Sequence, residues 1–265
     1  MKHANVSADQ FNNLSIYVEH NDGTKELLKG TLVPYHTAGD LGLQFVVNQF
    51  STFTMVQLPS AVQHHAYIQG YAEGLFKPEN KITRAEMAAI LARIVSKDEN
   101  GAEVAYTDVK ADYWASQAIA RVSKLDLMKG YADGTFRSDQ IITRAEMASI
   151  IARLLGPVTL KAAAYSDVAK SWAQADIDKA SSAGIISGYT DGTFKPENGL
   201  TRAEAVTMIN RYLGRGPLTG VPTPTWKDVP TSYWGYNDIE EASLEHAFTP
   251  KADGGEQYAP ISVTP

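Results

Sequence analysis

The sequence of 265 residues contains no cysteine, which excludes disulfide bonds, cysteine nucleophiles and thiolate metal sites. No apolar run is long enough to span a membrane, and the residues after Met1 include no apolar stretch of the kind found in a signal peptide. Met1 is therefore compatible with an artificial or internal start, so the compartment has to be inferred from other features. Basic residues are not in excess either, because the net charge is −6, which argues against a nucleic-acid-binding protein.

What the sequence does contain is a repeat. Gly-Tyr pairs begin at Gly70, Gly130 and Gly188, and Thr-Arg-Ala-Glu tetrads begin at Thr83, Thr143 and Thr201. Both series have spacings of 60 and 58 residues. We call the region around each pair and tetrad a B segment, and the B segments are residues 66–95, 128–155 and 186–213. An A segment, which holds an Asp-Val pair and a tryptophan, occurs at residues 106–127, 165–185 and 226–248.

The order of these segments predicts that the repeats close on themselves. Trp114 and Trp172 each lie 16 residues before a Gly-Tyr pair, whereas Thr54 holds that position before Gly70. The first B segment therefore lacks a preceding A segment, and the last A segment, which contains Trp234, lacks a following B segment. Repeat units cannot bury their apolar faces alone. We expect the last A segment to complete the first repeat and close a ring of three units.

The apolar pattern predicts helices in both kinds of segment. After the first tetrad, for example, apolar residues recur at helical spacing at Met87, Ile90, Leu91 and Ile94. The threonine and glutamate of each tetrad have the pattern of a capping box, which is a sufficient structural role for both. The sequence thus predicts a mostly α protein in which residues 59–248 form a helical pseudo-trimer of three repeats.

The two ends of the chain have a different character. Residues 1–58 carry an Asn-Asp-Gly turn between alternating segments, which predicts a hairpin and three to five strands in all. We expect this β-rich segment to be the β-sandwich-like end of an upstream domain. Residues 249–265 are polar, with a Gly-Gly pair and three prolines, and are expected to form an extended tail.

The arginine of each tetrad has two open interpretations. Arg84, Arg144 and Arg202 are expected at the first helical position, where a cation is mildly unfavourable. Each can form a salt bridge within the protein. Each can instead bind an anion bidentately, beside the free N–H groups of a helix N-terminus. We expect replacement by alanine to leave the fold intact, because the capping residues stay in place.

The aromatic and acidic residues of the repeats also allow two interpretations. Most of each tryptophan ring is expected in the core, although a tryptophan beside an arginine can hold an acidic sugar. The tyrosines of the Gly-Tyr pairs fit either the core or a groove wall, and the phenylalanines of the loops fit the core: Phe76, Phe136 and Phe194. Asp133 and Asp191 lie in tight turns, where bonding to the nearby backbone suffices. Each turn offers one carboxylate without EF-hand spacing, so no metal site is predicted.

These motifs resemble the S-layer homology family over roughly residues 62–248. The hallmarks of that family are a leading Asp-Val and Trp, a Gly-Tyr-x-Asp-Gly-x-Phe loop and a tetrad of this type. The resemblance implies a non-catalytic, monomeric module without a cofactor or membrane insertion. Such a module anchors a secreted protein at the bacterial cell wall. Its partner is an anionic polysaccharide, the secondary cell-wall polymer, bound typically through pyruvylated N-acetylmannosamine in grooves between repeats.

The resemblance also implies which residues contact the polymer. The arginine of each tetrad is expected to hold the acidic ketal, while the tryptophan, tyrosine and loop residues shape the groove. The complete expected set is Arg84, Arg144, Arg202, Trp114, Trp172, Trp234, Tyr71, Tyr131, Tyr189, Glu73, Gly74, Asp133, Gly134, Asp191 and Gly192.

The sequence departs from the family pattern in two loops, and two alternative functions stay open. The first loop has Glu73 and Leu75 where the others have Asp and Thr, and the second has Arg137-Ser138 where the others have Lys-Pro. The three grooves are therefore not expected to have equal affinity. A helical adaptor for protein partners would use the arginines in salt bridges, and a wall-glycan hydrolase would need two carboxylates in one groove.

Overall fold

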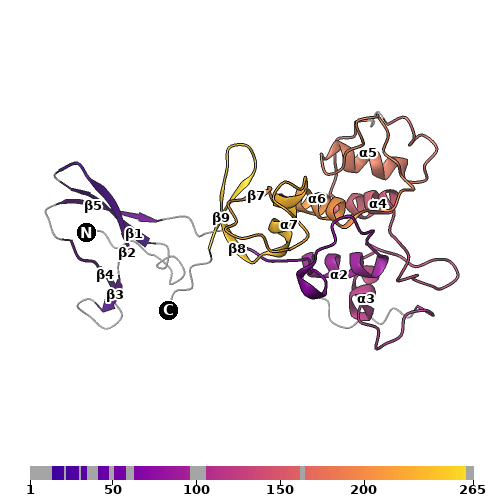
Figure 1. The fold of residues 1–265 in the computed structure, drawn as a ribbon, viewed down its shortest axis with the longest axis horizontal. Helices are drawn as coiled ribbons and strands as arrows, with labels where there is room; N and C mark the ends of the chain where they lie inside the picture. Colours follow the sequence, from indigo (N-terminus) through magenta and orange to yellow (C-terminus); the bar gives the residue numbers. More distant parts are fainter. Residues whose placement is uncertain are drawn as a thin grey trace. The chain divides into compact units, whose positions relative to one another are not determined.

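The computed structural model describes residues 14–20, 22–29, 31–34, 41–47, 51–57, 63–95, 106–161 and 165–260. Contacts divide the chain into two compact units, residues 1–62 and 63–265, and this division lies close to the join expected after residue 58. The described residues contain six α-helices and nine strands (Figure 1). The protein is therefore mixed α and β in this part of the chain, whereas the sequence indicated a mostly α protein.

Five short strands lie in the described residues of the first unit. Strands β1 (Leu14–His20), β2 (Lys25–Lys29) and β5 (Ser51–Gln57) form an antiparallel sheet in the order β2-β1-β5, and β3 (Thr31–Pro34) pairs with β4 (Leu41–Gln44). The hairpin predicted between the first two strands is confirmed, because β1 and β2 pair around a turn at Asp22-Gly23. Gly23 has a φ of +84°, a conformation that glycine adopts without steric cost.

The second unit contains all six predicted helices. The B segments form α2 (Arg84–Ile94), α4 (Arg144–Leu154) and α6 (Arg202–Leu213), and the A segments form α3 (Ser116–Lys124), α5 (Gln174–Ser182) and α7 (Tyr236–Ser243). Each B helix starts with the predicted capping box. In α2, the Thr83 hydroxyl accepts from the N–H of Glu86, while the Glu86 carboxylate accepts from the N–H of Thr83. None of the helices described is both long and apolar enough to cross a membrane.

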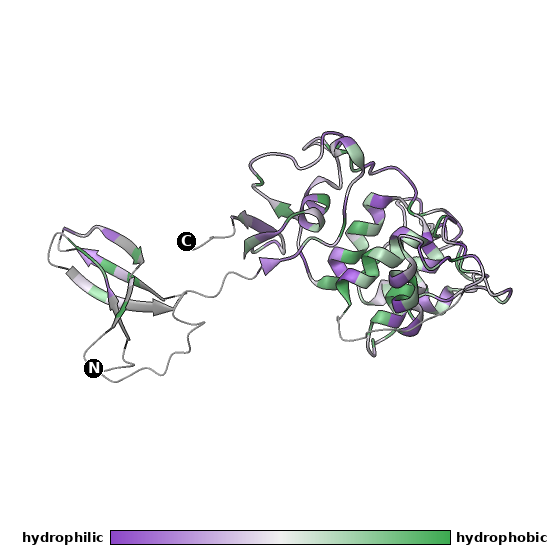
Figure 2. Ribbon diagram, turned by 90° about the horizontal axis from the view of Figure 1, so that it is seen from below, coloured by the Kyte–Doolittle hydropathy of each residue, from purple (hydrophilic) through white to green (hydrophobic). Residues whose placement is uncertain are grey.

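The helices pack in pairs around one apolar core. Each A helix packs against the B helix that precedes it in the sequence: α3 against α2, α5 against α4 and α7 against α6. Figure 2 shows the hydrophobic residues concentrated among these helices. Phe76, Phe136 and Phe194 are fully buried, as predicted.

A cyclic set of backbone hydrogen bonds joins the three repeats. The N–H of Ile82 donates to the carbonyl of Leu200 at 3.0 Å, that of Leu200 to Ile142 at 2.9 Å, and that of Ile142 back to Ile82 at 3.1 Å. Each of these residues lies directly before a tetrad threonine. The starts of the three B helices are therefore held together at one point, although they lie far apart in the sequence.

The A segments hold the loops of the Gly-Tyr pairs. Asp108 accepts from the backbone N–H groups of Phe136 and Arg137, both at 2.7 Å, and Asp167 holds the third loop in the same way. Asp228, in the last A segment, accepts from the N–H groups of the first loop at 2.8 and 2.7 Å. The last A segment thus makes with the first loop the contacts that the other A segments make with theirs.

Glycine is required where an aromatic ring of the A segment covers the loop. A Cβ added to Gly70 would lie 2.2 Å from the Trp226 ring, and one added to Gly130 would lie 2.2 Å from the Tyr106 ring. No side chain fits at these positions without a shift of the ring, so the Gly in each Gly-Tyr pair has a packing role.

The C-terminal residues form strands. A four-stranded sheet in the order β6-β8-β9-β7 contains β6 (Gln63–His64), β7 (Leu218–Thr219), β8 (His246–Pro250) and β9 (Glu256–Ala259). The sequence indicated an extended tail from residue 249, but residues 249–259 belong to the β8–β9 hairpin. The strands are too short for their alternation to stand out from a polar, glycine-containing sequence. Residues 261–265 lie outside the described residues.

Replacement of Asp228 by alanine tests the contact between the ends of the repeat region. Loss of two hydrogen bonds to an ionised carboxylate should lower the free energy of unfolding by about 1–2 kcal/mol. Denaturant unfolding of the full chain measures this, with the exposed Asp112→Ala as the control that should change little. Asp108→Ala and Asp167→Ala should cost as much as Asp228→Ala. If Asp228→Ala alone is neutral, the last A segment does not support the first loop.

Candidate functional site

Each tetrad arginine is buried between two repeats. The guanidinium of Arg84 donates from Nε to the carbonyl of Phe136 at 2.9 Å, from Nη2 to that of Lys129 at 2.7 Å, and from Nη1 to Glu146 Oε1 at 3.0 Å. All three partners belong to the second repeat. Arg144 makes the same three bonds to the third repeat. Arg202 donates to two carbonyls of the first repeat and lies 3.7 Å from Glu86.

This geometry bears on the two interpretations of the tetrad arginines. The arginines form salt bridges and backbone hydrogen bonds within the protein. The N–H groups at the start of α2 are also not free for an anion, because Arg84 N–H donates to Gln140 and Ala85 N–H to Ser138. These contacts argue against the expectation that alanine replacement leaves the fold intact, since the replacement would remove one partner from a glutamate and two carbonyls.

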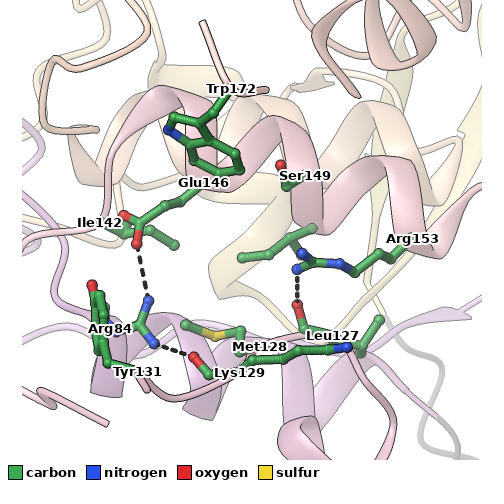
Figure 3. A pocket seen from close by; sticks show the side chains of 11 residues that line it. Arg84, Leu127, Met128, Lys129, Tyr131, Ile142, Glu146, Ser149, Arg153 and Trp172 are labelled. Atoms are coloured by element: carbon green, nitrogen blue, oxygen red, sulfur yellow. Dashed lines mark hydrogen bonds and ion pairs between the residues drawn. The ribbon is translucent and has the colours of Figure 1, made fainter. Parts of the chain in front are cut away.

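The arginines nevertheless line grooves between neighbouring repeats. Around Arg84, the groove is formed by Tyr131, Glu146, Arg153 and Trp172, together with Lys129 and apolar residues of the second repeat (Figure 3). Three bonds use three of the five N–H groups of a guanidinium. Arg84 thus reaches the groove with hydrogen-bonding capacity beyond its contacts within the protein.

A second groove repeats this arrangement one unit away. Arg202 lies there with Tyr71, Glu86, Arg93 and Trp114. The corresponding residues of the remaining repeat pair are also in contact. Arg144 lies over the Tyr189 ring at 4.7 Å, and both the arginine and the tyrosine hydroxyl donate to Glu204.

The tryptophans are not core residues. Trp114, Trp172 and Trp234 are 62%, 64% and 60% exposed, which corrects the expectation that most of each ring is buried. Trp114 and Trp172 stand at the rims of the two grooves. The three exposed tryptophans occupy the same place in their A segments.

Comparison with known proteins identifies the repeats. Three segments of the chain, residues 60–88, 105–148 and 164–206, match the S-layer homology domain. The chain belongs to the S-layer homology family.

Among its relatives are two proteins of Acetivibrio thermocellus. The chain is 42% identical over 212 residues to Cell surface glycoprotein 1, covering 74% of this chain and 9% of the relative. It is 41% identical over 204 residues to the Cellulosome-anchoring protein, covering 73% of this chain and 45% of the relative. The Surface layer protein of Brevibacillus choshinensis is 36% identical over 150 residues, or 54% of this chain and 13% of the relative. The chain thus spans less than half the length of each of these relatives.

The loop residues expected from the family lie outside the two grooves described above. Asp133 accepts from the hydroxyl and N–H of Thr135, and hydrogen bonds from Thr135 and then Arg137 lower the pKa of Asp133 to about 2. Asp191 has the same contacts with Thr193 and Lys195 and a pKa of about 2. Both aspartates therefore shape their own turns.

The first S-layer homology loop differs, as its sequence indicated. Glu73 lies in a 3₁₀ turn, η1 (Ala72–Gly74), with a φ of +68°. The glycines after the acidic residues also have positive φ: +73° at Gly74, +82° at Gly134 and +79° at Gly192. Their role in the structure is to make the tight turn that sets the Gly-Tyr loop.

Sequence analysis missed a second arginine in each S-layer homology repeat. Arg93, Arg153 and Arg211 each follow a tetrad arginine by nine residues. Arg153 donates to the carbonyl of Leu127 at 2.9 Å and Arg93 to that of Tyr67 at 3.2 Å, and both line their grooves. Alignment of the three B segments shows this repeated position, so the signal was present in the sequence.

The capping glutamate of the third repeat, Glu204, stays ionised beside Arg144. Burial opposes ionisation of Glu204, but hydrogen bonds from Thr201 and Tyr189 and the charge of Arg144 together hold its pKa below the ordinary value. A glutamate in this state accepts hydrogen bonds and offers no proton at neutral pH.

Replacement of Arg84 by alanine should destabilise the protein by about 2–3 kcal/mol, because a largely buried ion pair loses one member. Urea unfolding of the full chain measures the change. The exposed Arg137 pairs with Asp133 at 3.0 Å, so the control Arg137→Ala should cost less than about 1 kcal/mol. Equal effects of the two substitutions would contradict a structural role for Arg84.

Proposed function

We propose that this chain anchors a bacterial surface protein to the cell wall by holding an anionic polysaccharide in the grooves between S-layer homology repeats. The single observation that carries the proposal is the pairing, in one groove, of an exposed tryptophan from one repeat with a buried arginine from its neighbour. A tryptophan face covers the C–H groups of a sugar, and a guanidinium forms bidentate hydrogen bonds with a carboxylate. Together they match an amino sugar that carries an acidic ketal, such as pyruvylated N-acetylmannosamine.

The charge of the grooves supports an anionic ligand. The whole chain has a net charge of −6, so long-range attraction does not favour a polyanion. Locally the balance is reversed, because the first groove contains Arg84, Lys129 and Arg153 against Glu146. The second contains Arg93 and Arg202 against Glu86. Binding of the polymer therefore relies on these local cations.

The names of the relatives support the location. They are called a cell surface glycoprotein, a cellulosome-anchoring protein and a surface layer protein. We propose that this chain is likewise the cell-surface part of a longer secreted protein. Residues 1–58 share no motif with the repeats and are proposed to belong to the anchored part.

The cyclic contacts favour a pseudo-trimer with one groove per repeat pair. The hydrogen bonds of Ile82, Ile142 and Leu200 run round a ring, and each tetrad arginine reaches into the next repeat. Three grooves on one chain raise the avidity for a repeating polymer without any additional contact. The Arg202–Glu86 distance of 3.7 Å, against 3.0 Å for Arg84–Glu146, is a structural reason for unequal affinity.

The two alternative functions have less support. A glycan hydrolase needs a carboxylic acid with a raised pKa beside a second carboxylate. Glu204, the capping glutamate that pairs with Arg144, instead has a lowered pKa. An adaptor for protein partners would use the arginines in salt bridges, which are present, but it gives no reason for an exposed tryptophan beside the cations of each of the two grooves.

Tryptophan substitutions test the proposal, because the arginines cannot be removed without loss of stability. Trp172→Ala should weaken binding about tenfold or more, as expected for an aromatic anchor, and should leave the melting temperature nearly unchanged. Binding is measured by co-sedimentation with purified wall sacculi that carry or lack the attached polymer. Leu160→Ala is the matched control, since Leu160 is equally exposed at 62% and lies outside both grooves. Binding that does not require the polymer, or that survives substitution of all three tryptophans, would contradict the proposal.

A further inference from the structure

Two histidines and two glutamates converge at a place remote in sequence from the repeats' tetrads. His64 lies on β6, Glu241 on α7, His246 on β8 and Glu256 on β9. One ligand atom from each, a histidine nitrogen or a carboxylate oxygen, lies within 4.8 Å of the others. Four separate elements thus direct their polar atoms to one point.

The atoms of this cluster lie very close together. His64 Nδ1 is 2.6 Å from Glu241 Oε1 and 3.3 Å from Glu256 Oε2, and His246 Nε2 is 2.9 Å from Glu241 Oε2. The side chains of Glu241 and His246 are completely buried, that of Glu256 is 5% exposed and that of His64 is 14% exposed. The cluster is therefore shielded from water except on the His64 side.

Three atoms of the cluster have no hydrogen bond of acceptable geometry to the residues that the structure describes. They are Glu241 Oε2, His246 Nε2 and Glu256 Oε2. Buried polar atoms without a partner cost about 1–3 kcal/mol each, and native proteins contain few of them. Two of them, Glu241 Oε2 and His246 Nε2, lie 2.9 Å apart without forming a hydrogen bond. Three unsatisfied atoms at one place are the arrangement expected around a bound cation.

The outer contacts hold these atoms in the orientation that a metal ligand needs. The other ring nitrogen of His246, Nδ1, lies 3.1 Å from the carbonyl of Leu244. A carbonyl only accepts, so Nδ1 carries a proton, and Nε2 is the nitrogen that faces the cluster. The other oxygen of Glu256, Oε1, accepts from the N–H of Gly216 at 2.8 Å. Such outer hydrogen bonds to histidine and carboxylate ligands are typical of metal sites.

Among the described residues, one arginine lies beside the two carboxylates of the cluster. Arg215 Nη1 lies 3.7 Å from Glu241 Oε1 and offsets one carboxylate. The second carboxylate, that of Glu256, lies 3.3 Å from His64 Nδ1 and forms no ion pair with an arginine or lysine among the described residues. A cation bound between the two carboxylates would offset its charge.

We propose that His64, Glu241, His246 and Glu256 form a binding site for a divalent transition metal, with zinc as the best match. Two nitrogen and two oxygen ligands suit tetrahedral Zn²⁺, whose bonds of about 2.0–2.2 Å place neighbouring ligand atoms about 3.3–3.5 Å apart. The closest pair, 2.6 Å apart, therefore needs to separate by about 0.7–0.9 Å, and the most distant ligand atoms, which lie within 4.8 Å of one another, need to approach by up to about 1.5 Å. Four protein ligands leave no open position, which indicates a structural site.

The metal would join the two ends of the repeat region. His64 precedes the first repeat, whereas the other three ligands lie in or after the last A helix. An ion bound by all four would tie β6, α7 and the β8–β9 hairpin together. This role is separate from the grooves, so the proposal does not depend on polysaccharide binding.

Calorimetry with zinc chloride on the full chain, freed of metal by a chelator that is then removed, tests the site. We expect saturable binding of one Zn²⁺ per chain with a dissociation constant of about 1 µM or tighter, and a melting temperature raised by several degrees at excess zinc. Magnesium should not replace zinc, because it prefers oxygen ligands in octahedral geometry.

Two substitutions identify the ligands. His64→Gln and Glu256→Gln should each weaken zinc binding at least tenfold, while circular dichroism confirms that the variants are folded without metal. His64→Gln remains informative if Glu256→Gln does not fold, because His64 is partly exposed. The control is His65→Gln: His65 is the next residue, is 75% exposed and pairs with Glu245 outside the cluster. Absence of saturable zinc binding by the folded chain, or equal affinity in His64→Gln, His65→Gln and the unmodified chain, would overturn the proposal.

Discussion

The structure depends on one interaction that occurs at every boundary between repeats. The arginine of one tetrad is buried against the glutamate of the next. Glu146 is an example of this interaction. One of its oxygens accepts from the N–H of Thr143 and closes the capping box, while the other accepts from Arg84 of the preceding repeat. The same carboxylate therefore starts its own helix and binds the neighbouring unit. A repeat separated from its neighbours would keep the cap and leave an arginine without a partner.

The same arginine–glutamate interaction explains why the grooves lie between neighbouring repeats. Burial of Arg84 against the second repeat brings its guanidinium beside Tyr131, in the groove that Trp172 also lines (Figure 3). In the proposed function, Arg84 therefore serves both structure and recognition: the hydrogen bonds that hold Arg84 also hold a positive charge at a fixed place in the groove. A preorganised charge of this kind loses little conformational entropy when an anion binds.

The sequence was sufficient for features that depend on local patterns. The tetrad of Thr83 and Glu86 predicted a capping box, and apolar spacing predicted the helices, because both depend on residues within one or two turns. It was insufficient where distant segments meet. The burial of Arg84, the exposure of Trp114 and the bond from Arg84 N–H to Gln140 all depend on how one repeat packs on the next. The cluster of His64, Glu241, His246 and Glu256 joins residues almost 200 positions apart, so no local sequence pattern predicts it.

The measurement that tests the central claim most directly is calorimetry of the full chain with two saccharides that differ only in the pyruvyl ketal. The account predicts binding of the ketal-bearing sugar and a loss of about one to two decades in affinity without it, which corresponds to about 1.5–3 kcal/mol for a lost charge-assisted contact. Equal affinity for the two sugars would contradict the claim that the groove arginines recognise the acidic group.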